Sequence, residues 1–151
     1  MKYSEKISNQ LNELLTKNYD AEKGYRKAID NVDNNNLKIY FTNRANERKE
    51  FANEIKTEIE RYGEEPKESG SFKGTLHRNW MTLKSNLSNN NEEAVLEEAL
   101  RGEEASLEDY NDVISSDNVF PPSIDTMLKK QKNAIQASIN MVKVKEELAA
   151  S

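Results

Sequence analysis

Apolar residues recur at alternating steps of three and four in four long stretches of the chain, which is the period of a helix with one buried face. We therefore predict long helices over about residues 4–32, 35–62, 91–115 and 122–148. The first stretch shows the pattern at Ile7, Leu11, Leu14, Ala21, Tyr25, Ala28 and Val32. These elements predict an all-α protein.

Residues that favour turns and caps separate the predicted helices. The polar cluster at residues 31–36 ends the first helix, because short polar side chains compete for backbone hydrogen bonds. Gly63 is predicted to follow the last turn of the second helix, where glycine is favoured. The run Asn89-Asn90-Asn91 provides a cap for the third helix, and Pro121-Pro122 opens the fourth.

The longest connection joins the second and third long helices. Pro66, Gly70 and Gly74 break any helix there, and a short extra helix is predicted over about residues 75–87. Its apolar face consists of Leu76, Trp80, Leu83 and Leu87. Two short connections and one long crossover are the connectivity of ferritin-like bundles.

The first and third long helices share one pattern, which indicates a duplicated helical hairpin. Asn18 and Tyr25 are one heptad apart, and Glu103 and Tyr110 repeat that spacing 85 positions later. The same offset matches Leu11 with Leu96, Leu15 with Leu100, and Ala28 with Val113. We expect the two helices to be related by a pseudo-twofold axis in a four-helix bundle.

Composition excludes several classes of function. The 151 residues are 32% charged and 35% hydrophobic, which suits a slender bundle, and one domain over residues 1–151 is expected. The net charge of −5 opposes binding to nucleic acid, and the chain has no cysteine for a disulfide or a thiolate metal site. No apolar run is long enough for a membrane span or signal peptide, so no membrane association and a cytoplasmic location are expected.

Glu103 followed by Tyr110 on an inward-facing helix resembles the ferritin-like di-iron proteins, in which the carboxylate binds metal beside the phenol. Further motifs, in the same order along the chain, are Asp20, Gly24-Tyr25, Glu47-Arg48, Phe51-Ala52, Glu65-Pro66, Ser69-Gly70-Ser71, Gly74, Leu76-His77-Arg78, Trp80-Met81 and Arg101-Gly102-Glu103. Together they resemble an uncharacterised bacterial family of ferritin-like bundles, a domain of unknown function distantly similar to rubrerythrin and bacterioferritin. The resemblance implies an up-down-down-up bundle of bacterial origin, without a settled activity.

A di-iron carboxylate site needs about six protein ligands, including a Glu-x-x-His pair from each of two helices. The matching positions hold Glu103, the neutral Asn18, the pair Arg48 and Phe51, and the pair Ile135 and Ser138. Glu47 lies at the edge of the apolar stripe, and Glu50 points away from it. The chain's one histidine, His77, lies in the predicted short helix beside Trp80, where a cap or packing role is expected.

The arginine at an inward position suggests a different use of this layer. A buried carboxylate needs a counter-ion, and Arg48 supplies one for Glu103. We expect a polar core layer without a cofactor, made of Asn18, Tyr25, Arg48, Glu103, Tyr110 and Gln131. The alternative is an atypical iron or manganese site that uses Glu103 with Glu22, Glu47 or Asp20.

Two hypotheses of function follow. The first is a non-catalytic bundle that acts through self-association or, by analogy with the fold, a stress-related interaction. The second is an iron-binding oxidase or storage-type protein with a degenerate metal site. A homodimer is expected, because the edges of the helices at Tyr19, Tyr40 and Tyr62 are expected to be partly exposed.

Overall fold

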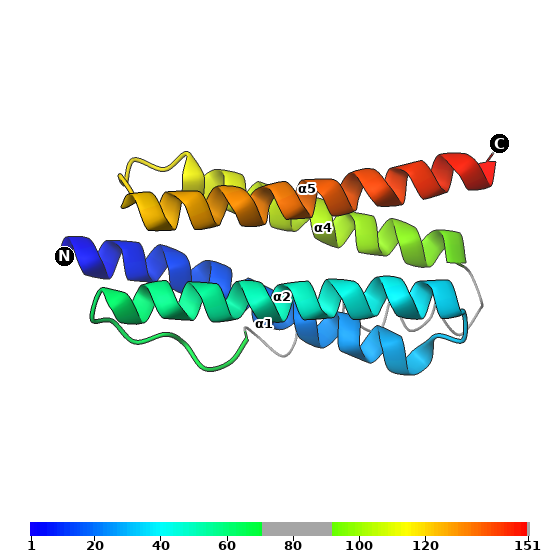
Figure 1. Cartoon of the computed structure of the whole chain (residues 1–151), viewed down its shortest axis with the longest axis horizontal. Coiled ribbons are helices and arrows are strands. Elements are labelled where there is room, and N and C mark those ends of the chain that lie inside the picture. The colour runs from blue at the N-terminus through cyan, green and yellow to red at the C-terminus, as the bar shows by residue number, and fades with distance from the viewer. Residues whose placement is uncertain (71–91, 151) are drawn as a thin grey trace. The chain divides into compact units, whose positions relative to one another are not determined.

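The computed structural model describes residues 1–70 and 92–150 of the chain (Figure 1). These residues form helices and contain no strand, so the prediction of an all-α protein is confirmed. The helices are α1 (Tyr3–Asn31), α2 (Asn35–Arg61), α4 (Glu92–Ile114) and α5 (Pro122–Ala150). Each end lies within two residues of its predicted position. The short helix predicted over residues 75–87 lies outside the described residues.

The chain divides into two compact units, Met1–Asn90 and Asn91–Ser151. In the first unit α1 packs against α2, and in the second α4 packs against α5 (Figure 1). Each unit is an antiparallel helical hairpin. The duplicated hairpin that the sequence predicts is therefore matched by two units with the same pair of elements. A single domain over residues 1–151 stays a prediction.

The ends of α2 are set by the residues that the sequence singled out. Asn34 caps the N-terminus, because its side-chain Oδ1 accepts a 3.1 Å hydrogen bond from the Leu37 amide. Gly63 follows the last turn in a left-handed conformation (φ 77°), which costs glycine nothing. Its amide donates to the carbonyl of Glu60, and the Glu64 amide donates to the carbonyl of Ile59. These two bonds form a Schellman motif.

The turn between α4 and α5 is longer than the turn in the first unit. Ser116 ends α4 with a 2.8 Å bond from its hydroxyl to the Val113 carbonyl. Pro122 is the first residue of α5, where its fixed φ fits a helix and its missing N–H is not needed. The carbonyl of Pro121 accepts bonds from the amides of Ile124 and Asp125, which satisfies the start of the helix.

Two contacts fix the register of α1 against α2. Arg48 contacts Asn18 through a hydrogen bond, and Phe41 stacks on Tyr25 with ring centroids 5.9 Å apart. A step of seven residues forward on α1 matches seven backward on α2, as an antiparallel pair requires. The apolar residues buried around this register are Ile7, Leu11, Leu14, Leu15, Phe51, Ile55 and Ile59. Burying each such side chain contributes about 1.5–3 kcal/mol to stability.

The core of the second unit is also built from regularly spaced residues on two facing helices. Tyr110 on α4 bonds to Gln131 on α5, which fixes the register of this hairpin. The apolar residues buried on the two helices include Val95, Ala99, Val113, Ile124, Leu128, Ile135, Ile139 and Val142. The five on α5 recur at steps of three, four and seven, as the sequence pattern predicts.

The segment that follows α2, residues 64–70, runs along α1 and is named the strap here (green in Figure 1). Asn12 holds it with both ends of its side-chain amide, donating to the Glu65 carbonyl (3.2 Å) and accepting from the Lys67 amide (2.8 Å). The Tyr19 hydroxyl donates to the Lys67 carbonyl at 2.9 Å, and the Ser4 hydroxyl donates to the Glu64 carboxylate at 3.0 Å.

The strap is nearly fully extended. From Ser4 to Asp20, α1 rises about 24 Å at 1.5 Å per residue. The strap has six residue steps, which reach about 20 Å at 3.3 Å per residue, and the side chains of Glu64 and Ser4 bridge the rest of the path. Its last residue, Gly70, lies so close to Asp20 that a Cβ there would overlap the Asp20 carboxylate. Glycine is therefore required at this position unless Asp20 moves.

One premise of the predicted homodimer is wrong. Tyr40 was expected at an exposed helix edge, but it is buried. Its ring packs edge-on against Phe41 with centroids 5.4 Å apart, and the Arg44 guanidinium lies 5.9 Å from the ring centroid. The apolar stripe of α2 is thus wider than its heptad pattern suggests. Tyr19 and Tyr62 are half-buried.

The outer faces of the helices are charged. Ion pairs one turn apart join Glu22 to Arg26 and Asp125 to Lys129, at 2.8 and 2.9 Å. Such exposed pairs contribute little to stability because water screens them. No described helix has the length and apolarity that crossing a bilayer requires.

We predict that Asn12→Ala releases the strap. Unfolding free energy should fall by about 1–2 kcal/mol, because two hydrogen bonds to backbone groups are lost. The Lys67 amide, which donates a hydrogen bond to Asn12 Oδ1, should exchange its hydrogen faster in deuterated solvent. Asn9→Ala on the exposed face of α1 is the matched control, since it makes the same change without touching the strap. Equal effects of the two substitutions would contradict this role of Asn12.

Candidate functional site

Arg48 and Asn18 form the centre of the polar layer in the first unit. Arg48, on α2, is 1% exposed, and its Nη1 donates a 3.1 Å hydrogen bond to Asn18 Oδ1 on α1. Asn18 is also buried, and its Nδ2 donates to the Leu14 carbonyl at 2.8 Å. The two bonds orient the amide so that its oxygen meets the guanidinium. The structure therefore brings together two of the three predicted layer residues that lie in the first unit.

Tyr25, the third predicted layer residue in the first unit, lies one heptad from Asn18 on α1. Its ring stacks on Phe41 at an interplanar angle of 30°. Offset stacking of this kind stabilises aromatic pairs beyond their buried area. Tyr25 is half-buried, so it lies at the margin of the core, against Phe41 of α2.

The other three layer residues are buried in the second unit. Tyr110 on α4 donates from its hydroxyl to Gln131 Oε1 on α5, at 2.5 Å. Gln131 and Glu103 are each 0% exposed. Glu103 lies one heptad before Tyr110 on the same face of α4. Ile135 and Ser138, the α5 residues at the positions matching ferritin-like ligands, are also buried.

The carboxylates of the alternative metal site have other surroundings. Glu22 pairs with Arg26 at 2.8 Å, and Glu47 pairs with Arg44 at 2.8 Å. Both carboxylates are 22% exposed, so they lie at the rim of the hairpin and not in its core. Asp20 lies against the end of the strap.

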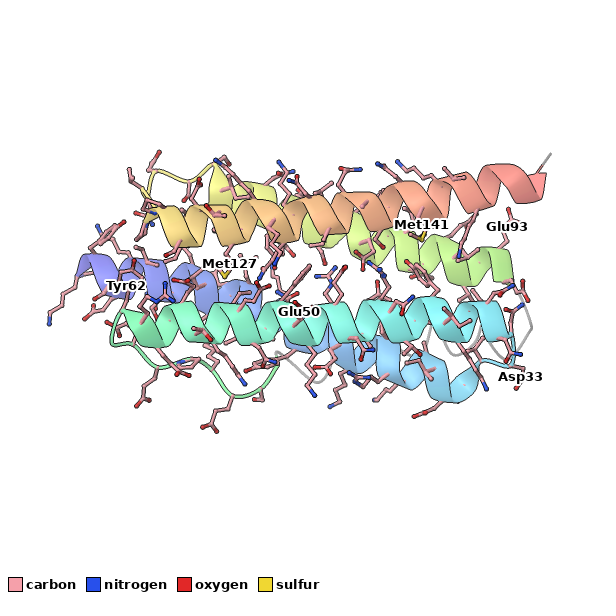
Figure 2. The ribbon with its side chains drawn as sticks, viewed as in Figure 1. Asp33, Glu50, Tyr62, Glu93, Met127 and Met141 are labelled. Carbon is pink, nitrogen blue, oxygen red and sulfur yellow. The ribbon has the colours of Figure 1, made fainter. Side chains whose placement is uncertain are left out.

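No group of three or more His, Asp or Glu residues in the described part of the chain has a geometry that could hold a metal ion. Glu50, near the middle of α2, is exposed as the helical angle predicts (Figure 2). His77 and Trp80 lie outside the described residues.

The chemistry available to the layer follows from its donors and acceptors. An arginine has five N–H donors and no acceptor, and it stays protonated, so it binds anions or carbonyl oxygens and not cations. Its acceptor in the first unit is a neutral amide. The second unit presents a carboxylate, a phenol, an amide and a hydroxyl on facing stripes of α4 and α5. These groups suit hydrogen bonding more than nucleophilic chemistry.

Residues 6–116 match a family model described as "Domain of unknown function (DUF2383)". The chain belongs to this family. No curated protein matches the chain.

The DUF2383 match covers α1, α2, the connection that follows and α4. It therefore includes Asn18, Arg48, Glu103 and Tyr110. Helix α5, with Gln131 and Ser138, lies beyond its end. The family description assigns no activity to these residues.

Sequence reasoning missed the residues that hold the strap. Asn12 and Ser4 lie on α1, about 50 and 60 positions from the strap residues that they bond. A helical asparagine flanked by apolar positions was a usable signal, because a buried amide needs partners. Nothing in the sequence indicated which residues those partners would be, because the strap has no repeating pattern of apolar residues.

We predict that Tyr110→Phe lowers the unfolding free energy by about 1–2 kcal/mol, because it leaves the buried Gln131 oxygen without its phenol donor. Tyr3→Phe is the control. Tyr3 is half exposed on α1, and removing its hydroxyl should change stability by less than about 0.5 kcal/mol. Urea unfolding of the two variants measures both values. Indistinguishable midpoints would show that the Tyr110–Gln131 bond contributes nothing.

Proposed function

We propose that this chain is a non-catalytic helical scaffold, in which a polar core layer takes the place of a ferritin-like metal layer. The observation that carries the proposal is the burial of Arg48 at one of the matching positions, bonded to the neutral Asn18. A permanently charged guanidinium repels metal cations and offers them no lone pair. A functional di-metal site at this level would require acidic or imidazole ligands instead.

We further propose that the two hairpins assemble as a ferritin-like, up-down-down-up bundle. The support is the residue pattern that α1 and α4 share. Tyr25 and Tyr110, at equivalent positions of α1 and α4, each contact the facing helix of their own hairpin. Asn18 and Glu103 each lie one heptad before that tyrosine. The connection between hairpins is long enough for the crossover that this topology needs.

In the proposed bundle, Arg48 of the first unit pairs with Glu103 of the second. Each is buried and carries a charge of the opposite sign. Burying either charge alone costs several kcal/mol, and a bidentate pair offsets much of that cost. The pairing would select one assembly of the hairpins.

We predict that Arg48→Met destabilises the protein by about 3 kcal/mol, because Glu103 loses its counter-ion. The double variant, Arg48→Met with Glu103→Leu, should recover most of this loss, since an apolar pair needs no compensation. Denaturant unfolding of the single and double variants gives the coupling free energy.

Arg44→Met is the matched control for this cycle. Arg44 is also on α2 and mostly buried, but it pairs with Glu47. Its loss should be additive with that of Glu103→Leu. If the losses of Arg48→Met and Glu103→Leu were also additive, the two residues would not form the proposed pair. If Glu103→Leu alone abolished metal binding, the iron or manganese alternative would replace the proposal.

The scaffold is proposed to act by self-association, through the second unit. Met141 and Val144 lie one turn apart on α5 and are 49% and 56% exposed (Met141 is labelled in Figure 2). Lys143, which lies between the two residues of this apolar pair in the sequence, is 3.8 Å from Glu104 on α4 of the same chain, so the lysines of α5 and the carboxylates of α4 are suited to pair. Helix α4 has one basic residue, Arg101, and many acidic residues outside its buried face: Glu92, Glu93, Glu97, Glu98, Glu104, Glu108, Asp109 and Asp112. A second copy, with its α5 against α4, would extend this pairing between chains and cover the apolar pair.

We predict that Met141→Glu shifts the chain towards monomer, because it places a carboxylate in an apolar contact that faces an acidic helix. Asn140→Glu, on the neighbouring exposed position of α5, adds the same charge outside the pair and should shift it much less. Sedimentation velocity at several protein and salt concentrations measures the association. A wild-type chain that stays at 17.3 kDa at all concentrations would rule out the homodimer.

A further inference from the structure

The strap, residues 64–70, is held on α1 by hydrogen bonds and not by a buried apolar surface. None of its residues is buried in the chain, so none is buried within the first unit either. Segments with few buried apolar contacts open at a lower free energy than the core of a protein. Helices α1 and α2, in contrast, pack against each other, and their buried apolar residues include Leu11, Leu15 and Ile55.

The bonds of the strap converge on the backbone of Lys67. Its amide donates to Asn12 Oδ1 at 2.8 Å, and its carbonyl accepts from the Tyr19 hydroxyl at 2.9 Å. Asn12 Nδ2 donates to the carbonyl of Glu65, two residues earlier, at 3.2 Å. Because these bonds lie so close together on the strap, losing them releases it from α1 as one piece.

The hairpin itself holds the two side chains that bind the strap. Asn12 Nδ2 is also 3.3 Å from Ser8 Oγ, one turn earlier on α1. The Lys56 ammonium group on α2 lies 5.6 Å from the centroid of the Tyr19 ring, a cation–π contact. Neither contact involves the strap. The site on α1 is therefore formed by the hairpin, whether or not the strap occupies it.

The two ends of the strap allow it to move separately from the helices. The turn at Gly63 is held by bonds to α2 alone, from the Gly63 amide to the Glu60 carbonyl and from the Glu64 amide to the Ile59 carbonyl. Release of the strap from α1 leaves both of these bonds intact. At the other end, Gly70 lies against the Asp20 side chain without any Cβ.

We propose that the strap is a latch, which opens and closes on α1 while the α1–α2 hairpin stays folded. With the latch closed, the chain leaves the first hairpin beside Asp20 on its way to α4. With the latch open, it leaves from the C-terminal end of α2, about 20 Å away, which is the length of the strap. Closing therefore restricts the positions that the second unit can take. The proposal goes beyond the scaffold function and depends only on contacts within the first unit.

Native-state hydrogen exchange of the full chain in low concentrations of urea tests whether the strap opens by itself. Exchange of the Lys67 amide should be nearly independent of urea, because opening the strap exposes little surface. Exchange of the Ile55 amide, in the core of α2, should accelerate with urea. Tyr19→Phe should raise the exchange rate at Lys67 about fivefold, the effect of one lost hydrogen bond.

Tyr62→Phe is the matched control for Tyr19→Phe. Tyr62 is also half-buried, and its hydroxyl has no hydrogen bond among the residues that the structure describes. Exchange at Lys67 should therefore equal that of the wild type. Equal rates in the two variants would overturn the latch contact. A urea dependence at Lys67 as steep as that at Ile55 would show that the strap opens only when the hairpin unfolds.

A distance measurement tests where the strap lies. The chain has no cysteine, so spin labels can be attached at Ser69→Cys and Lys23→Cys, two exposed positions at the end of the strap and on α1. Pulsed electron paramagnetic resonance should give a short, narrow distance distribution in the otherwise wild-type chain. Asn12→Ala should lengthen and broaden it, and Asn9→Ala should not. A distribution that Asn12→Ala leaves unchanged would contradict the proposal.

Discussion

The hydrogen bond between the buried Arg48 and Asn18 is the constraint on which the first hairpin depends. A guanidinium removed from water must be met by acceptors, or its charge destabilises the fold by several kcal/mol. Asn18 provides its oxygen at 3.1 Å, and the Leu14 carbonyl fixes the orientation of the same amide. A shift of α2 by one residue would break this contact and the Tyr25–Phe41 stack together. The buried hydrogen bond thus fixes the register of α1 against α2, which apolar packing alone would define less strictly.

In the second hairpin, different polar groups fix the register of the two helices. Its register depends on a neutral bond from Tyr110 to Gln131, and its charge is the carboxylate of Glu103. The equivalent positions Asn18 and Glu103 thus carry different groups, a neutral amide that accepts from Arg48 in the first hairpin and a buried carboxylate in the second. The proposed polar layer requires this difference.

Local structure was predictable from the sequence because its causes are local. The ends of α2 follow from the Asn34 cap and the left-handed Gly63, and the burial of Arg48 and Glu103 follows from the heptad. The strap was not predictable, since the bonds of Asn12 reach residues more than 50 positions away without any period. The burial of Tyr40 was also missed, because its contacts with Phe41 and Arg44 widen the apolar stripe beyond the heptad positions.

The central claim is that the buried polar layer is structural and holds no metal. The most direct test is the elemental content of the chain, purified without an affinity tag or chelator from cells supplied with iron and manganese. A structural layer built around Arg48 predicts metal far below one ion per chain, unchanged in Glu103→Leu. Iron or manganese in near-stoichiometric amount, lost in Glu103→Leu, would contradict the account.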